Sequence, residues 1–152
     1  MLDEIYNTKI LDFAGNIPRT GRLATPDASA TAHSKLCGST VTVDVHLEHG
    51  KVVDFGHDVK ACALGQAASS IMARNVVGSD LEELREVRDA MYRMLKNDGE
   101  PPSGKWSDLQ YLEPVRTYKA RHMSTLLTFD ATVEAVEKAL AVMTPDAVAE
   151  TC

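Results

Sequence analysis

The stretch TVTVDVHLEHGKVVDFGHDVK constrains the fold of this chain more than any other part of the sequence. Apolar and polar residues alternate from Val41 to Leu47, the sequence EHG follows, and a second run extends from Val52 to Val59. A period of two residues on both sides of a turn that contains glycine predicts a β-hairpin with one buried face. Other elements of the chain must cover that face.

The segment before the hairpin predicts one helix and a long loop. Residues 2–15 carry apolar side chains at near-helical spacing, and this pattern ends at Gly15. The next stretch, NIPRTGRLATPDASATAHSKLCGS, is rich in proline, glycine, serine and threonine, which indicates a loop. Within this loop we expect one weak strand near Ala28 to Ser34.

After the hairpin the pattern changes to helices. The small residues of ACALGQAASSIMARNVVG predict a helix that ends at Gly78. Ser79 and Glu82 form a capping-box pattern ahead of an amphipathic helix in DLEELREVRDAMYRMLKN. DGEPPSGKW predicts a surface loop and DLQYLEPV a short helical turn, and a long helix is expected from Ala120 to Val142.

Together these elements predict the α+β class, with a small three-stranded antiparallel sheet and helices packed on one side of it. Of the 152 residues, we expect residues 1–143 to form a single domain and residues 144–152 to form a mobile C-terminal tail.

The charge and composition of the chain argue against several classes of function. A net charge of -6 does not suit a protein whose main partner is nucleic acid. No apolar run approaches the length of a membrane span, and the N-terminal MLDEIYNTKI lacks the apolar core of a signal peptide. Three cysteines without an export signal predict a reducing compartment, the cytoplasm, and favour metal or sulfur chemistry over disulfides.

Two cysteines stand at opposite ends of the predicted hairpin, so folding is expected to bring them to the same end of the sheet. Cys37 precedes the first strand, next to Gly38, and Cys62 lies between the second strand and a helix. A thiol at a helix N-terminus lies at the positive end of the helix dipole, which lowers its pKa and favours the reactive thiolate. The charge of the nearby Lys60 could stabilise the Cys62 thiolate further.

The residues alone also leave a structural interpretation open. Free cysteine is commonly a small buried apolar residue, and the 24 residues between Cys37 and Cys62 are not a CxxC spacing. We expect Cys152 to be incidental, and His46 and His57 to be cross-strand neighbours on a polar face. Structural roles are also expected for the remaining strand-side histidines and for three methionines at helical spacing: His33, His49, Met72, Met91 and Met94.

Three segments carry a further pattern: Cys37-Gly38-Ser39, the hairpin followed by DVKACALGQAASSIMA, and RHMSTLLTFDATVEAV. They resemble the NifU N-terminal/IscU-like family of iron–sulfur scaffold proteins, and the last segment is similar to the one that holds the third cysteine of the family. The charged stretch between Cys62 and Met123 resembles the SufU subtype, whereas LEPVR is a poor match to the LPPVK motif of IscU. The resemblance spans nearly the whole chain and implies a SufE/NifU-like fold.

The resemblance also implies a site for an iron–sulfur cluster or zinc made of Cys37, Cys62 and His122, with Cys37 as the persulfide acceptor. Two positions depart from the family pattern. Ser39 stands where the family has an aspartate, and Met123 stands where it has its third cysteine. A thioether offers no charge to a cluster, and its sulfur is already alkylated, so Met123 cannot carry a persulfide.

The function implied is a non-enzymatic scaffold that transiently holds iron and sulfur and passes them to acceptors. Its implied partners are a cysteine desulfurase and apo iron–sulfur proteins, with no nucleic acid and no membrane. Because each chain offers only two thiolates, a cluster could be shared in a homodimer. Two alternatives stay open: a zinc-dependent persulfide acceptor with sulfurtransferase activity, and a degenerate paralogue that binds partners without metal.

Overall fold

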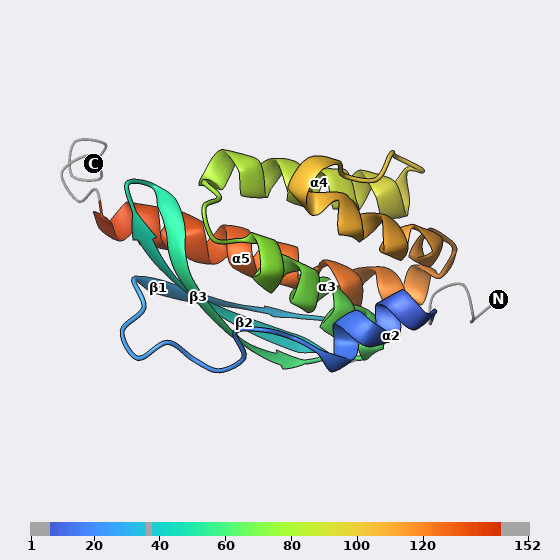
Figure 1. Cartoon of the computed structure of the whole chain (residues 1–152), viewed down its shortest axis with the longest axis horizontal. Helices are drawn as coiled ribbons and strands as arrows, with labels where there is room; N and C mark the ends of the chain where they lie inside the picture. Colours follow the sequence, from blue (N-terminus) through green and yellow to red (C-terminus); the bar gives the residue numbers. More distant parts are fainter. Residues whose placement is uncertain (1–6, 36–37, 144–152) are drawn as a thin grey trace.

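A computed structural model describes residues 7–35 and 38–143 of the chain. It contains one sheet of three antiparallel strands, so the predicted sheet is confirmed. The strands are β1 (Ala28–His33), β2 (Thr40–Glu48) and β3 (Lys51–Lys60). β2 lies in the centre of the sheet and forms the predicted hairpin with β3 (Figure 1).

The hairpin turns through only two residues, His49 and Gly50. Glu48 pairs with Lys51 across the turn, and φ is 54° at His49 and 78° at Gly50. Two central residues with positive φ form the tight turn whose twist matches that of the flanking strands. Glycine adopts such a conformation without steric cost, which explains its presence at this position.

The helices gather on one face of the sheet, so the predicted α+β architecture is confirmed (Figure 1). α5 packs directly on β1 and β2, and α3 and α4 pack against α5. The helical elements are α2 (Thr8–Gly15), α3 (Ala63–Asn75), α4 (Leu81–Lys96), the 3-10 helices η1 (Gly104–Thr117) and η2 (Lys119–Arg121), and α5 (His122–Met143). The core between helices and sheet is formed by fully buried side chains that include Val43, Val45, Phe55, Ile71 and Phe129.

The N-cap of α4 and the extent of η1 differ from the prediction. The N-cap of α4 is Asp80, whose carboxylate accepts a hydrogen bond from the backbone N–H of Glu83, and is not Ser79. The Ser79 hydroxyl instead donates to the Glu83 carboxylate at 3.0 Å, so a side-chain contact replaces the predicted capping role. The predicted short turn in DLQYLEPV is part of η1, which has 14 residues and contains Pro114. Proline lacks a backbone N–H and disfavours a regular α-helix here.

The segment between α2 and β1 covers part of the sheet face that points away from the helices. Asp44 lies on this face and is fully buried, and its carboxylate accepts three kinds of hydrogen bond. Arg22 donates from Nε at 2.7 Å and from Nη2 at 2.9 Å, the backbone N–H of Leu23 donates at 2.9 Å, and the Ser29 hydroxyl donates as well. These bonds satisfy the buried charge and fasten the segment to the sheet.

The prediction that His46 and His57 are cross-strand neighbours on a polar face is wrong. A register shift next to His46 leaves His46 opposite Asp54 and His57 opposite Val43. Such a bulge turns the residues that follow to the other face of the sheet, so His57 points into the core. Its Nε2 donates to the carbonyl of Pro18 at 2.9 Å, and burial lowers the pKa of the imidazole, which favours its neutral form.

Several predictions fall on residues outside the described ranges. These are the start of the first predicted helix, Cys37, the tail at 144–152 and Cys152. The division into one domain and a tail therefore stays a prediction. In the part of the chain that the structure describes, no helix is both long and apolar enough to cross a membrane.

Candidate functional site

Cys62 lies at the junction of β3 and α3, as the sequence predicts. It is the N-cap residue of α3, and its side chain is partly exposed. In the sheet register Thr40 lies opposite Lys60, so the start of β2 and the end of β3 meet at the same end of the sheet. Residues 38–40 therefore approach the chain segment that carries Cys62.

Backbone hydrogen bonds join the described residues on either side of residues 36 and 37 at this end of the sheet. The backbone N–H of Ser34 donates to the carbonyl of Ser39 at 2.9 Å, and that of Gly38 donates to the carbonyl of Ser34 at 2.9 Å. Gly38 has a φ of 71°, in the left-handed region that favours glycine. Ser39 is buried, with 4% of its surface exposed. Cys37 itself lies outside the described residues, and its place in the site stays a prediction.

The first turn of α5 lies against Cys62. The sulfur of Cys62 is 3.4 Å from the hydroxyl oxygen of Ser124, which is almost completely buried. Gly65, in the first turn of α3, makes this approach sterically feasible, because a Cβ there would lie 2.8 Å from the carbonyl oxygen of Ser124. The two helices thus meet with their N-terminal ends together at the Cys62 sulfur.

The surroundings of Cys62 favour its thiolate. Burial raises the pKa of the thiol, but the hydrogen bond with Ser124 and the neighbouring backbone N–H groups of Gly65 and Leu64 lower it. The positive charge of Arg121 lowers it further, and the net pKa is below the ordinary value. The sequence points to Lys60 as the nearby cation, whereas the charge that acts on Cys62 comes from Arg121.

His122 opens α5 and is buried. Its Nε2 lies 2.9 Å from the carbonyl oxygen of Arg116 and 3.2 Å from that of Val115. Carbonyl oxygens only accept hydrogen bonds, so Nε2 carries the proton and the lone pair of the ring is on Nδ1. Metal-binding histidines commonly donate their other N–H to a backbone carbonyl in this way. A metal contact of His122 must therefore use Nδ1.

Among residues 7–35 and 38–143, no three side chains of histidine, cysteine, aspartate or glutamate converge closely enough to hold a metal ion. A site that includes Cys62 needs further ligands from elsewhere, such as Cys37 or an incoming molecule. Met123, at the family position of the third cysteine, is partly buried and packs against the hydrophobic core.

Three other histidines lie at polar contacts or at the hairpin turn, and their predicted structural roles stay predictions. Nδ1 of His33 lies 3.1 Å from the Thr40 hydroxyl, and Nδ1 of His46 lies 2.9 Å from the Asp27 carboxylate. His49 forms the hairpin turn. Three methionines are buried in the core: Met72, Met91 and Met94.

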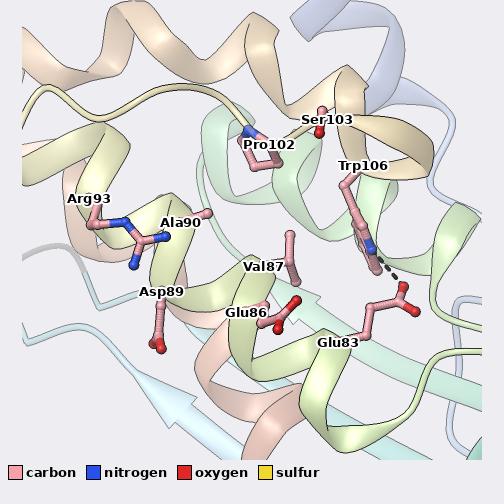
Figure 2. Close-up of a pocket in the computed structure, with 9 residues that line it drawn as sticks. All are labelled: Glu83, Glu86, Val87, Asp89, Ala90, Arg93, Pro102, Ser103 and Trp106. Atoms are coloured by element: carbon pink, nitrogen blue, oxygen red, sulfur yellow. Dashed lines mark hydrogen bonds between the residues drawn. The ribbon is translucent and has the colours of Figure 1, made fainter.

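A cavity of about 490 Å³ lies between α4 and the start of η1, away from the cysteine site (Figure 2). Trp106 forms one wall, and its Nε1 donates to the Glu83 carboxylate at 2.8 Å. Glu86, Asp89 and Arg93 also line the cavity. The residues that line this cavity include no cysteine and no histidine, so it does not contribute to thiolate chemistry.

Sequence reasoning did not identify Ser124 and Arg121 as neighbours of Cys62. Both belong to RHMSTL, directly around the family position of the third cysteine. Their significance depends on the packing of α5 against α3, which brings residues 62 positions apart in sequence, Cys62 and Ser124, into contact. The local pattern carries no signal for that contact.

Residues 5–109 match the family model described as the NifU-like N terminal domain. The iron-sulfur cluster assembly scaffold protein IscU of Thermotoga maritima is 26% identical over 136 residues, which cover 88% of this chain and 94% of that protein. The zinc-dependent sulfurtransferase SufU of Bacillus subtilis is 23% identical over 137 residues, which cover 90% of this chain and 92% of that protein.

Solved structures are similar over the same extent. The N-terminal part of a nitrogen-fixing NifU-like protein from Brucella abortus is 62% identical with a TM-score of 0.90, covering 91% of this chain and 96% of that one. A putative iron-sulfur cluster assembly scaffold protein for the SUF system from Fervidobacterium islandicum is 21% identical with a TM-score of 0.81, covering 88% and 98%. The second similarity shows a shared fold alone.

Proposed function

Since this chain belongs to the NifU-like N-terminal domain family, we propose that it is a scaffold for the assembly of iron–sulfur clusters. Iron and sulfide are its cargo, which it holds through the thiolates of Cys37 and Cys62 and passes to acceptor proteins. The Thermotoga maritima relative carries the name of such a scaffold. A cysteine desulfurase in the cytoplasm is the proposed source of the sulfur.

The environment of Cys62 is the observation that supports this proposal most directly. Its side chain is partly exposed, so cargo can reach the sulfur. Its lowered pKa increases the share of thiolate, the form that binds iron. A thiol buried for packing alone would have a raised pKa instead, because an apolar environment disfavours its charged form.

The donor set suits an open site better than a closed structural zinc site. Zinc in structural sites takes four ligands from thiolates, imidazoles and carboxylates. The proposed ligands are the thiolates of Cys62 and Cys37 and the Nδ1 lone pair of His122. Bound zinc would supply a Lewis acid that keeps the cysteine sulfurs as thiolates. Three ligands leave one position for an incoming thiol.

The alternative is a sulfurtransferase, and the relative from Bacillus subtilis named a zinc-dependent sulfurtransferase favours it. In this reaction a cysteine thiolate of the chain attacks the outer sulfur of a donor persulfide, R–S–SH. The S–S bond of the donor breaks, the donor leaves as R–S⁻, and the attacking cysteine becomes the persulfide. No further oxidant or reductant is needed. The family resemblance favours Cys37 as the acceptor.

Anaerobic reconstitution with ferrous iron and sulfide tests the scaffold function. We expect the wild-type chain to gain a visible charge-transfer band, and Cys37→Ser and Cys62→Ser to lose it. Cys152→Ser is the matched control, because it also removes one thiol and should keep the band. A wild-type chain that gains no band contradicts the proposal and supports the degenerate paralogue.

Mass spectrometry after incubation with a cysteine desulfurase and cysteine tests the alternative. The sulfurtransferase predicts the gain of one sulfur atom on Cys37, only when zinc is present. No gain on any cysteine rejects the sulfurtransferase and leaves the scaffold function to the reconstitution experiment.

A further inference from the structure

We propose that Ser124 is the positioning residue of Cys62, and that its hydroxyl holds the Cys62 sulfur in the orientation in which it receives cargo. This inference rests on the proposed function for what the sulfur receives, but the positioning itself is a property of the chain alone. The residue of α5 that contacts Cys62 is therefore Ser124, and not its neighbour Met123, which stands at the family position of the third cysteine.

Among the described residues, Ser124 is the only side chain that hydrogen-bonds to the Cys62 sulfur. Ser124 is itself held by burial and by a second hydrogen bond. Cys62 is an N-cap residue, yet its side chain makes no capping hydrogen bond to α3. Its sulfur is partly exposed and lies 3.4 Å from Ser124 Oγ. Ser124 is 1% exposed and its Oγ also lies 3.1 Å from the carbonyl oxygen of Arg121. Because burial and the Arg121 carbonyl restrict the Ser124 hydroxyl, this hydroxyl can fix the rotamer of the partly exposed Cys62 side chain.

The chemistry of the hydroxyl suits both forms of the cysteine. A serine hydroxyl has one proton and two lone pairs, and it rotates to suit its neighbours. While the Ser124 hydroxyl donates its hydrogen bond to the Arg121 carbonyl, its oxygen can accept a hydrogen bond from the S–H of a neutral Cys62. When Cys62 is a thiolate, the same hydroxyl can turn and donate to the sulfur. A methionine sulfur at position 123 can accept weakly but cannot donate, so it cannot replace this function.

The backbone around the contact is arranged for close approach. A Cβ on residue 65 would lie 2.8 Å from the carbonyl oxygen of Ser124. Only glycine at this position therefore allows the present separation of α3 and α5. The hydroxyl of Ser124 reaches Cys62 because the two helix starts meet here. The hydrogen bond of Ser124 to the Arg121 carbonyl lies within one turn of the chain and does not require the close packing of α3 on α5.

Thr125 provides a matched control in the same turn of α5. Its hydroxyl donates to the same Arg121 carbonyl at 2.9 Å, and it is fully buried. Cys62 contacts Ser124 and not Thr125 in the hydrogen bonds of the described residues. Thr125→Val therefore removes the same kind of hydroxyl from the same acceptor and leaves the Cys62 contact in place.

The test measures the side-chain rotamer of Cys62 by NMR, from its Hα–Hβ couplings, in the full metal-free chain at one pH. We expect one dominant rotamer in the wild type, in Thr125→Val and in Ser124→Thr, which keeps a hydroxyl. Ser124→Ala should give averaged, intermediate couplings. An unchanged set of couplings in Ser124→Ala overturns the proposal, as does equal averaging in Thr125→Val. Far-UV circular dichroism identifies any variant that fails to fold, and Ser124→Thr then decides.

A second readout uses Co²⁺ as the metal probe, with its visible spectrum and its affinity in competition with a chelator. Ser124→Ala should bind Co²⁺ about tenfold more weakly, as for loss of a group that orients a ligand, with Thr125→Val within about twofold of the wild type. Equal affinities in Ser124→Ala and the wild type overturn the positioning role. A wild-type chain without Co²⁺ binding contradicts the proposed function instead, and the rotamer measurement still decides this inference.

Discussion

Gly65 of α3 faces the backbone carbonyl of Ser124 in α5 so closely that a Cβ at residue 65 would lie 2.8 Å from the carbonyl oxygen. The carbonyl belongs to a buried helix and cannot move without shifting α5. This approach links the position of the Cys62 site to the packing of the two helices, and it leads to the first prediction.

Gly65→Ala should lower the free energy of unfolding by about 2 kcal/mol, because the added methyl would lie 2.7 Å from the Cβ of Ala61 as well as 2.8 Å from the Ser124 carbonyl oxygen. The variant should also lose part of its metal affinity, since Ser124 is displaced from Cys62. Denaturant unfolding measures the first effect. Gly15→Ala is the control, because a Cβ at Gly15 would meet no atom within 4 Å. Equal stability of both variants would contradict the tight contact.

The charge of Arg121 should control the reactivity of Cys62. Arg121 lowers the pKa of the thiol, so Arg121→Gln should raise it and move the rise in alkylation rate with pH to higher pH. The measurement follows the rate of Cys62 modification by iodoacetamide in the metal-free chain, with mass spectrometry to assign the site. Lys60→Gln removes an exposed cation close in sequence and should leave the profile in place. If only Lys60→Gln shifted the pH profile of the alkylation rate, Lys60 and not Arg121 would be the cation that lowers the pKa of Cys62.

Asp44 should make the fold sensitive to acid. Burial raises its pKa, but the hydrogen bonds from Arg22, Ser29 and Leu23 outweigh burial, and the net pKa is lowered. A carboxyl with a lowered pKa contributes stability that is fully present above its ordinary pKa of about 4. That contribution is lost as the pH falls through the folded-state pKa.

Asp44→Asn should therefore unfold at lower denaturant, with a loss of about 2 kcal/mol at neutral pH and a smaller difference from the wild type at low pH. Unfolding midpoints at several pH values measure this. Asp58→Asn is the control on the neighbouring strand, because Asp58 is exposed. A difference between Asp44→Asn and the wild type that grows as the pH falls would reverse the expected sign.

Met123→Cys should make the chain bind the reconstituted iron–sulfur cluster more tightly. It restores a thiolate next to Ser124, at the family position of the third cysteine, and thiolates are the usual ligands of iron–sulfur clusters. The reconstituted cluster should be lost several-fold more slowly to a chelator than in the wild type. Met123→Leu keeps the apolar volume without a thiol and should behave like the wild type. Faster loss in Met123→Cys would show that position 123 does not face the cargo.

The sequence predicts the sheet and helices because their patterns are local. The alternation from Val41 to Leu47 and the glycine of the turn suffice for the hairpin, and the structure contains it. The side of the sheet on which His57 lies could not be predicted in this way. It depends on a register shift next to His46, and one extra residue in a strand reverses the alternation without leaving a clear pattern.

The candidate site divides in the same way. The position of Cys62 before a helix follows from the change of period after the hairpin, and the structure places it there. Ser124 and Arg121 become relevant only through the crossing of α3 and α5, which single-sequence patterns do not specify. The roles of Cys37 and His122 as ligands rest on the family resemblance and stay predictions.

The most direct test of cargo binding is the iron and sulfide content of freshly purified protein kept free of oxygen, for the wild type and for Cys62→Ser. The scaffold function predicts iron and acid-labile sulfide together in the wild type, and a loss of both in Cys62→Ser while Cys152→Ser retains them. Equal contents in the wild type and Cys62→Ser, or none in the wild type after anaerobic reconstitution, would contradict it.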